Sequence, residues 1–132
     1  MAFRGLKILV VDDDVHSLAS IGDFLERDGH SIRMARCGWE AVDIVRRLRR
    51  EKWHFELSIL DFHVPDLSGI EIFQRLSLLD PGLGAIFVSG DSSDSMEDSI
   101  QQAGGFALCP KPLDLGGLRR LIEAYERTRL LQ

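Results

Sequence analysis

Reactive side chains follow four apolar segments of the chain, each at the point where the segment ends. They are the aspartates Asp12, Asp13 and Asp14 after residues 7–11, Asp61 after residues 57–60, Ser89 after residues 85–88, and Lys111 after residues 106–109. Carboxylates that lie close together repel one another unless a cation lies between them, and ligand sets made only of oxygen favour a hard ion such as Mg²⁺. A lysine and a serine hydroxyl beside such a carboxylate suit a phosphoryl group. The residue types therefore indicate phosphoryl chemistry, with Asp61 as the group that can accept the phosphate covalently.

The segment around Asp61 determines where this chemistry is expected. Residues 57–60 offer almost no polar face, which is typical of a buried strand. Pro65 and Gly69 mark the loop that leads to the next helix. Asp61 is thus expected at the carboxyl end of a central strand, where open α/β sheets place their ligand sites. Taken alone, this position suits a metal ligand, a nucleophile or a helix cap.

Strand and helix patterns alternate along the whole chain. Strands are expected at residues 7–11, 30–34, 57–61, 85–88 and 106–109, and helices near 18–28, from Gly38 through Lys52, near 70–79, near 96–103, and from the cap Asp114 past Tyr125. Alternating units with short connections predict an α/β fold in which a parallel sheet has helices on both faces. In such a sheet the carboxyl ends of all strands lie at one edge, so the reactive side chains are expected to meet there.

Composition limits the class of protein. The 132 residues suffice for one domain with a sizeable core, and 45% apolar with 28% charged residues is ordinary for a soluble globular protein. The net charge of −5 argues against general nucleic-acid binding. Cys37 and Cys109 form no metal-binding motif and favour a reducing compartment. No apolar run approaches membrane-spanning length and no secretion signal precedes the first strand, so a cytoplasmic protein is expected.

Several enzyme classes lack their usual motifs. Neither of the glycine-rich phosphate-binding patterns, G-x-x-x-x-G-K-[ST] and G-x-G-x-x-G, occurs in the chain. No Ser-His-Asp or Cys-His arrangement stands out. A nucleotide-binding enzyme and a hydrolase with a serine or cysteine nucleophile are therefore not indicated.

The chain resembles a response-regulator receiver domain of bacterial two-component signalling. The residues that carry the resemblance are Ile8–Asp14, Asp61–Gly69, Phe87–Gly90 and Lys111-Pro112, which follow in the order of that family and span almost the whole sequence. The resemblance implies a doubly wound, five-stranded parallel sheet of flavodoxin-like topology with strand order 2-1-3-4-5. It also implies a single receiver domain over residues 1–132, with a core at about residues 6–127.

The resemblance also implies roles for individual residues. Asp61 would accept phosphate from a sensor histidine kinase or a histidine phosphotransfer protein. Asp12, Asp13 and Asp61 would bind Mg²⁺ together with the backbone carbonyl of His63. Lys111 would pair with the acceptor and the phosphate, and Ser89 would hydrogen-bond the phosphate and drive the switch. No metal role passes to Asp14, which occupies a variable acidic position of the family.

Some positions depart from the family pattern or tune it. Leu108 stands three residues before the lysine, where the family usually has an inward-turning aromatic, and Phe106 is the nearest aromatic residue. Ser89 replaces the commoner threonine but keeps the hydroxyl. Gly90 is small and leaves room beside the phosphate, whereas His63 and Asp91 flank the path of an attacking water; the three positions are expected to tune the lifetime of the phosphoryl group. The bond between Lys111 and Pro112 is expected to be cis, as is common in the family.

Phosphorylation is expected to change partner binding, and the target would be a downstream protein or an appended effector domain. Formation of a homodimer is left open. No membrane or nucleic-acid contact is expected, and no enzymatic product beyond the domain's own phosphorylation and dephosphorylation. A phosphorylation-independent scaffold stays open because of Leu108. An aspartyl-phosphate hydrolase of the haloacid-dehalogenase type is disfavoured, because that class needs an aspartate two residues after the nucleophile and position 63 is His.

Overall fold

Five strands and five helices alternate along the chain in the computed structural model, which describes residues 5–131. The strands are β1 (Lys7–Val11), β2 (Ser31–Ala35), β3 (Leu57–Asp61), β4 (Gly84–Ser89) and β5 (Ala107–Pro110). The helices are α1 (Val15–Arg27), α2 (Gly38–Arg50), α3 (Gly69–Leu79), α4 (Asp94–Gln102) and α5 (Leu115–Leu130). This order confirms the alternating pattern that the sequence predicts.

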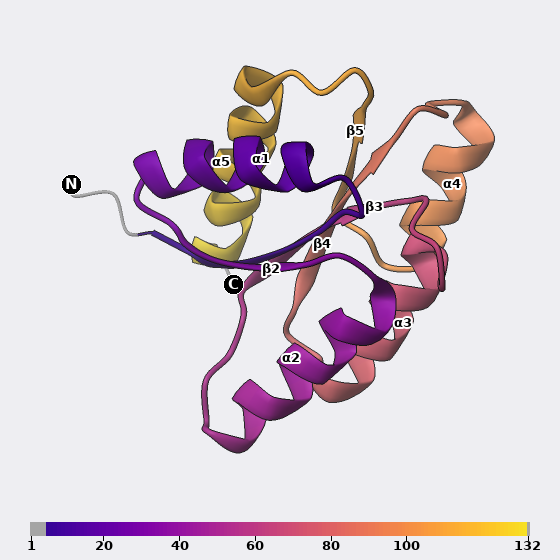
Figure 1. Cartoon of the computed structure of the whole chain (residues 1–132). Helices are drawn as coiled ribbons and strands as arrows, with labels where there is room; N and C mark the ends of the chain where they lie inside the picture. The colour runs from indigo at the N-terminus through magenta and orange to yellow at the C-terminus, as the bar shows by residue number, and fades with distance from the viewer. Residues whose placement is uncertain (1–4, 132) are drawn as a thin grey trace.

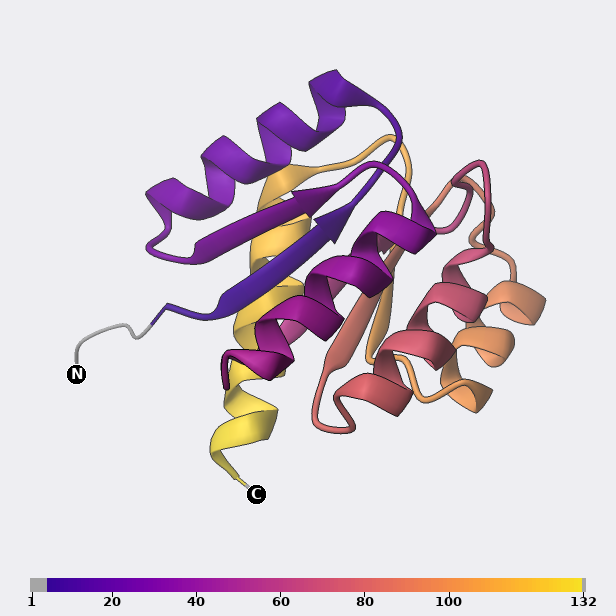
Figure 2. The same ribbon diagram turned by 60° about the horizontal axis from the view of Figure 1, so that its bottom comes forward.

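The strands form one parallel sheet in the order β2-β1-β3-β4-β5, as expected for the flavodoxin-like topology. Helices α1 and α5 cover one face of the sheet, and α2, α3 and α4 cover the other (Figures 1 and 2). Because all strands run the same way, their carboxyl ends lie along one edge. Strand β2 lies on one side of β1 and strands β3, β4 and β5 lie on the other, so Asp12 and Asp61 follow or end neighbouring strands.

Two apolar clusters, one on each face of the sheet, hold the helices in place. Alternate strand residues point to opposite faces, so Leu9, Leu60 and Phe87 pack under α2, α3 and α4, whereas Ile8 and Ile59 pack under α1 and α5. Strand β3 is buried along its whole length, as the sequence predicts for residues 57–61. The sheet is thus a rigid support for the groups at its carboxyl edge.

Element ends differ from the predictions by one or a few residues. Strand β2 begins at Ser31 rather than residue 30, and β5 runs one residue later than predicted. The prediction that α2 runs through Lys52 is wrong: the helix ends at Arg50, and Lys52 takes a left-handed conformation with φ of 61°. The turn directs the chain back towards β3, which the apolar and arginine pattern of the helix does not reveal. None of the helices within residues 5–131 combines the length and apolar character needed to cross a bilayer.

Candidate functional site

Three carboxylates at the ends of two neighbouring strands, β1 and β3, meet at the carboxyl edge of the sheet. One oxygen each of Asp12, Asp13 and Asp61 lies within 4.8 Å of the others, and Asp12 and Asp61 are buried whereas Asp13 is exposed. Oxygen ligands at this spacing could hold a small hard cation. The structure therefore brings together the three side chains that the sequence predicts as metal ligands.

Asp12 is the carboxylate most affected by its surroundings. Its Oδ1 accepts the Asp14 N–H at 2.9 Å, while its backbone N–H donates to the Ala35 carbonyl. Burial raises the pKa of Asp12 to about 6, and the nearby negative charge of Asp61 contributes in the same direction. A bound cation would oppose both effects and favour the ionised carboxylate.

Asp61 lies at the end of β3 between a cation and a backbone donor. The Lys111 ammonium donates to both Asp61 oxygens, at 3.1 and 3.2 Å, and the His63 N–H donates to Oδ1 at 3.1 Å. Lys111 follows β5, so the contact spans the neighbouring strand β4. The peptide bond between Lys111 and Pro112 is cis, as expected.

The hydroxyl group predicted for the site belongs to Ser89, the last residue of β4. Ser89 is fully buried at the end of β4, and its Oγ accepts the Asp91 N–H at 3.0 Å. Gly90 and Asp91 are exposed, and backbone and side-chain hydrogen bonds with Ser93, helped by the charge of His63, lower the pKa of Asp91. The register of β4 against β3 pairs Val88 with Asp61, which places Ser89 one residue beyond the acceptor along the sheet edge.

Three other residues singled out in the sequence, Asp14, Leu108 and Phe106, lie outside the acidic cluster. Asp14 caps α1, where its carboxylate accepts the His16 N–H at 2.9 Å, in agreement with its exclusion from the metal set. Leu108 packs partly buried against the cluster under α2, α3 and α4. Phe106 precedes β5, and its ring packs edge-on against Tyr125 at 5.2 Å. Phe106 therefore has a packing partner in α5 and does not replace the missing aromatic at position 108.

One residue near the site was missed by the sequence analysis. The carboxylate of Asp66, in the β3–α3 loop, accepts the Gly38 N–H at 2.8 Å and the Trp39 N–H at 2.9 Å, so it caps α2 from a distant part of the chain. Although partial burial opposes ionisation, these bonds hold the pKa of Asp66 below its ordinary value. Because 28 residues separate Asp66 from Gly38, no local sequence pattern marks the contact.

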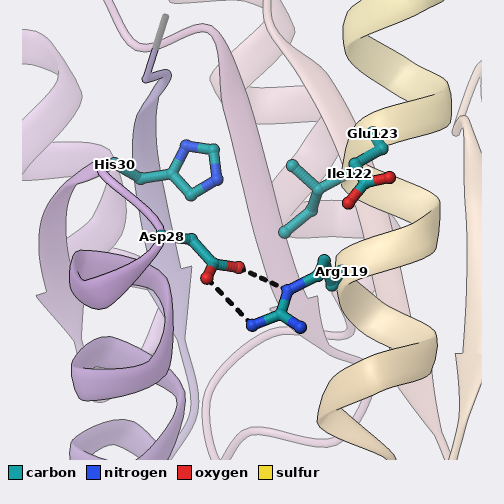
Figure 3. A pocket seen from close by; sticks show the side chains of 5 residues that line it. All are labelled: Asp28, His30, Arg119, Ile122 and Glu123. Atoms are coloured by element: carbon teal, nitrogen blue, oxygen red, sulfur yellow. Dashed lines mark hydrogen bonds and ion pairs between the residues drawn. The ribbon is translucent and has the colours of Figure 1, made fainter. Parts of the chain in front are cut away.

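A separate pocket of about 300 Å³ lies near the amino end of β2, between the end of α1 and α5 (Figure 3). Asp28 and Arg119 face each other across it in a two-point ion pair, with N···O distances of 2.8 and 2.9 Å. His30, Ile122 and Glu123 complete the lining. The ion pair joins α5 to the segment between α1 and β2, at the opposite edge of the sheet from Asp61.

Comparisons with known proteins agree with this geometry. The chain matches the response regulator receiver domain over residues 8–123. Sporulation initiation phosphotransferase F of Bacillus subtilis is 27% identical over 119 residues, which cover 90% of this chain and 92% of that protein. Transcriptional regulatory protein GlrR of Escherichia coli is 29% identical over 123 residues, which cover 93% of this chain but only 27% of that protein.

A solved structure shows the same fold. The CheY-like response regulator receiver domain protein from Methanospirillum hungatei superimposes with a TM-score of 0.83 at 26% identity, covering 98% of this chain and all of that one. The acidic cluster of Asp12, Asp13 and Asp61 fits the phosphorylation site of such domains. The chain belongs to the response regulator receiver domain family of two-component signalling.

Proposed function

We propose that this protein is a phosphorylation-controlled switch in which Asp61 accepts the phosphoryl group. The observation that carries the proposal is the buried Asp61 carboxylate, with the Lys111 ammonium at 3.1 Å and oxygens of Asp12 and Asp13 within 4.8 Å. An Asp61 oxygen would attack the phosphorus of a phosphohistidine on a sensor kinase or phosphotransfer protein. The P–N bond then breaks, and its electron pair stays on the imidazole nitrogen of the donor.

The charges of the cluster support a divalent cation in this reaction. Asp12, Asp13 and Asp61 carry three negative charges when ionised and Lys111 carries one positive charge, which leaves an excess of two negative charges. Oxygen ligands favour Mg²⁺, which would be held by the three carboxylates and the backbone carbonyl of His63. When bound, the ion would offset negative charge on the phosphoryl oxygens and so allow them to approach a carboxylate.

The neighbouring side chains would hold and time the phosphoryl group. Lys111 would exchange part of its contact with Asp61 for a phosphoryl oxygen, and the Ser89 hydroxyl would donate a second hydrogen bond. His63 and Asp91 flank the approach of the water that attacks phosphorus and releases Asp61 as a free carboxylate. Gly90 adds no side chain to this approach, so the lifetime of the phosphoryl group is expected to depend on these three positions.

The output would be a change in partner binding. The chain covers most of its Bacillus subtilis relative but about a quarter of the Escherichia coli regulator, so either a stand-alone receiver of residues 1–132 or a receiver with an appended effector domain fits. The partners would be a histidine kinase or phosphotransfer protein upstream and a protein target or a second copy downstream. This chemistry would take place in the cytoplasm, without direct contact with nucleic acid or membrane.

Intact mass spectrometry after incubation with acetyl phosphate and Mg²⁺ tests the proposal. The expected result is the gain of one phosphoryl group, which is absent from Asp61→Asn and absent when excess chelator is present. Beryllofluoride, which mimics an acyl phosphate, separates a short phosphoryl lifetime from a lack of reactivity. If the protein gains no phosphoryl group and does not bind beryllofluoride, the alternative of a phosphorylation-independent scaffold replaces the switch.

A further inference from the structure

The β3–α3 loop (residues 62–68) is closed by its own backbone. The Gly69 N–H donates to the Phe62 carbonyl at 3.0 Å, and His63 and Ser68 form an isolated antiparallel bridge. At the base of the loop, the His63 N–H donates to Asp61 Oδ1. The base is therefore hydrogen-bonded to the proposed phosphoryl acceptor, and backbone contacts join the two ends of the loop.

The tip of this loop is bound to α2 by Asp66. Its two carboxylate oxygens accept the first two N–H groups of the helix, those of Gly38 and Trp39. The residue that precedes the helix, Cys37, makes no capping hydrogen bond with its side chain. Asp66 thus supplies the cap that the local sequence of α2 lacks, and its negative charge lies at the favourable end of the helix dipole.

Close packing accompanies these two hydrogen bonds. A Cβ atom added to Gly38 would lie 2.7 Å from Cδ1 of Leu67, so the first turn of α2 rests directly on the loop. Leu67 is buried, whereas the Trp39 ring is about half exposed with the Arg75 guanidinium 4.5 Å from its centre. The loop and the first turn of α2 therefore form one packed unit that reaches the surface at Trp39.

We propose that Asp66 is a positioning residue that couples occupancy of the Asp61 site to the N-terminus of α2. It would hold the loop so that the His63 carbonyl lies within reach of a cation, and it would carry any displacement of the loop to Gly38 and Trp39. This inference rests on the proposed function, because it concerns binding of Mg²⁺ and of a phosphoryl group at Asp61. Residues that orient metal ligands from outside the ligand set commonly change metal affinity when they are replaced.

Titration calorimetry with Mg²⁺ on the full chain tests the positioning role. Asp66→Ala is expected to weaken Mg²⁺ binding by roughly threefold to tenfold, at or below the range for direct partners of metal ligands, because the contact acts through the loop. Asp66→Asn keeps one acceptor oxygen and should fall between the wild type and Asp66→Ala. The matched control is Glu40→Ala, which removes a carboxylate from the same turn of α2, where it accepts the Arg36 N–H at 3.0 Å.

Backbone amide resonances test the coupling itself. In the wild type and in Glu40→Ala, saturating Mg²⁺ and beryllofluoride should shift the amide signals of Gly38 and Trp39 as well as that of His63. In Asp66→Ala the His63 signal should still shift, but those of Gly38 and Trp39 should not. A cap with a purely structural role would change stability and leave the ligand-induced shifts of α2 intact.

The outcomes separate the two proposals. If the wild type binds Mg²⁺ and beryllofluoride while Asp66→Ala binds Mg²⁺ with wild-type affinity and keeps the α2 shifts, the coupling is wrong and the switch stands. If the wild type binds neither, the proposed function fails and the coupling with it. If Asp66→Ala does not fold, the same comparison is made with Asp66→Asn, for which unchanged affinity and unchanged shifts likewise overturn the coupling.

Discussion

Replacing Asp12 by asparagine is expected to stabilise the metal-free protein at neutral pH. Asp12 is 5% exposed, and burial, with the charge of Asp61, raises its pKa from 3.8 to about 6. The ionised carboxylate is therefore less favourable in the folded protein than in the unfolded chain. Asparagine has a similar shape and keeps an oxygen that can accept the Asp14 N–H, but carries no charge.

The size of the effect follows from the pKa difference. A shift from 3.8 to about 6 corresponds to about 3 kcal/mol at neutral pH, which is an upper limit for the gain. The hydrogen bond from Asp14 is already included in this pKa, so the expected gain falls below the limit only because asparagine replaces the carboxyl group imperfectly; a gain of about 1.5 kcal/mol, half of the limit, corresponds to about 4–8 °C in Tm. Because the folded pKa is the higher one, the penalty is complete above about pH 6 and falls to about half at pH 5.

Thermal and urea unfolding in excess chelator, at about pH 5 and pH 7.5, measures this difference. Asp13→Asn is the matched control, because Asp13 belongs to the same cluster but is exposed, and it should change stability by less than about 0.5 kcal/mol. With Mg²⁺ the order should reverse, since only the wild type gains binding free energy. The reasoning is refuted if Asp12→Asn is no more stable than the wild type in chelator, or if its advantage does not shrink at low pH.

Three further predictions concern single side chains. Lys111→Gln should slow phosphorylation of Asp61 by acetyl phosphate by at least about tenfold, measured by intact mass over time, and an unchanged rate would exclude a role for the ammonium group. Ser68→Ala removes the capping box of α3 and should lower the free energy of unfolding by about 1 kcal/mol in urea titrations, whereas a neutral result would mean that the cap is redundant. Burial lowers the pKa of His30, whose Nδ1 accepts the Leu6 N–H. The unfolded chain therefore takes up a proton on this residue at a higher pH than the folded protein does, and the free energy of unfolding should decrease as the pH falls below about 6.5. His30→Gln should flatten that decrease, and a pH profile identical to the wild type would show that other groups cause it.

Strand positions could be predicted where a strand carries its own apolar run, whereas the order of the strands in the sheet was implied by the family resemblance. Residues 57–61 illustrate this, since a short apolar run followed by turn residues is typical of a strand buried on both faces. Helix ends were harder. The start of α3 is marked by a local S-x-x-E pattern, the capping pair Ser68 and Glu71, which the prediction did not use. The end of α2 is followed by Lys52 in a left-handed backbone conformation, which a lysine side chain does not favour and which the sequence therefore does not indicate.

The candidate site likewise contains residues that the sequence predicts and one that it does not. Asp12, Asp13, Asp61, Ser89 and Lys111 could be placed at one edge because parallel strands end together, so their positions follow from the fold. Asp66 could not be recognised, because its role depends on how the β3–α3 loop packs against α2, and that contact joins segments distant in sequence. Contacts of this kind depend on tertiary packing and carry no local pattern.

The distribution of stability in the molecule favours a switch that moves loops rather than strands. The two apolar clusters hold the strands on both faces of the sheet, whereas the charged residues of the site follow the strand ends, so the connections after the strands are expected to respond first. A divalent cation and a phosphoryl group change the charge of a partly buried cluster, and the segments that contact the cluster must respond. Of these, the β3–α3 loop has a fixed connection to a helix N-terminus through Asp66, whereas Gly90 and Asp91 are exposed. A change at Asp61 is therefore expected to reach the surface at α2 as well as along the β4–α4 connection.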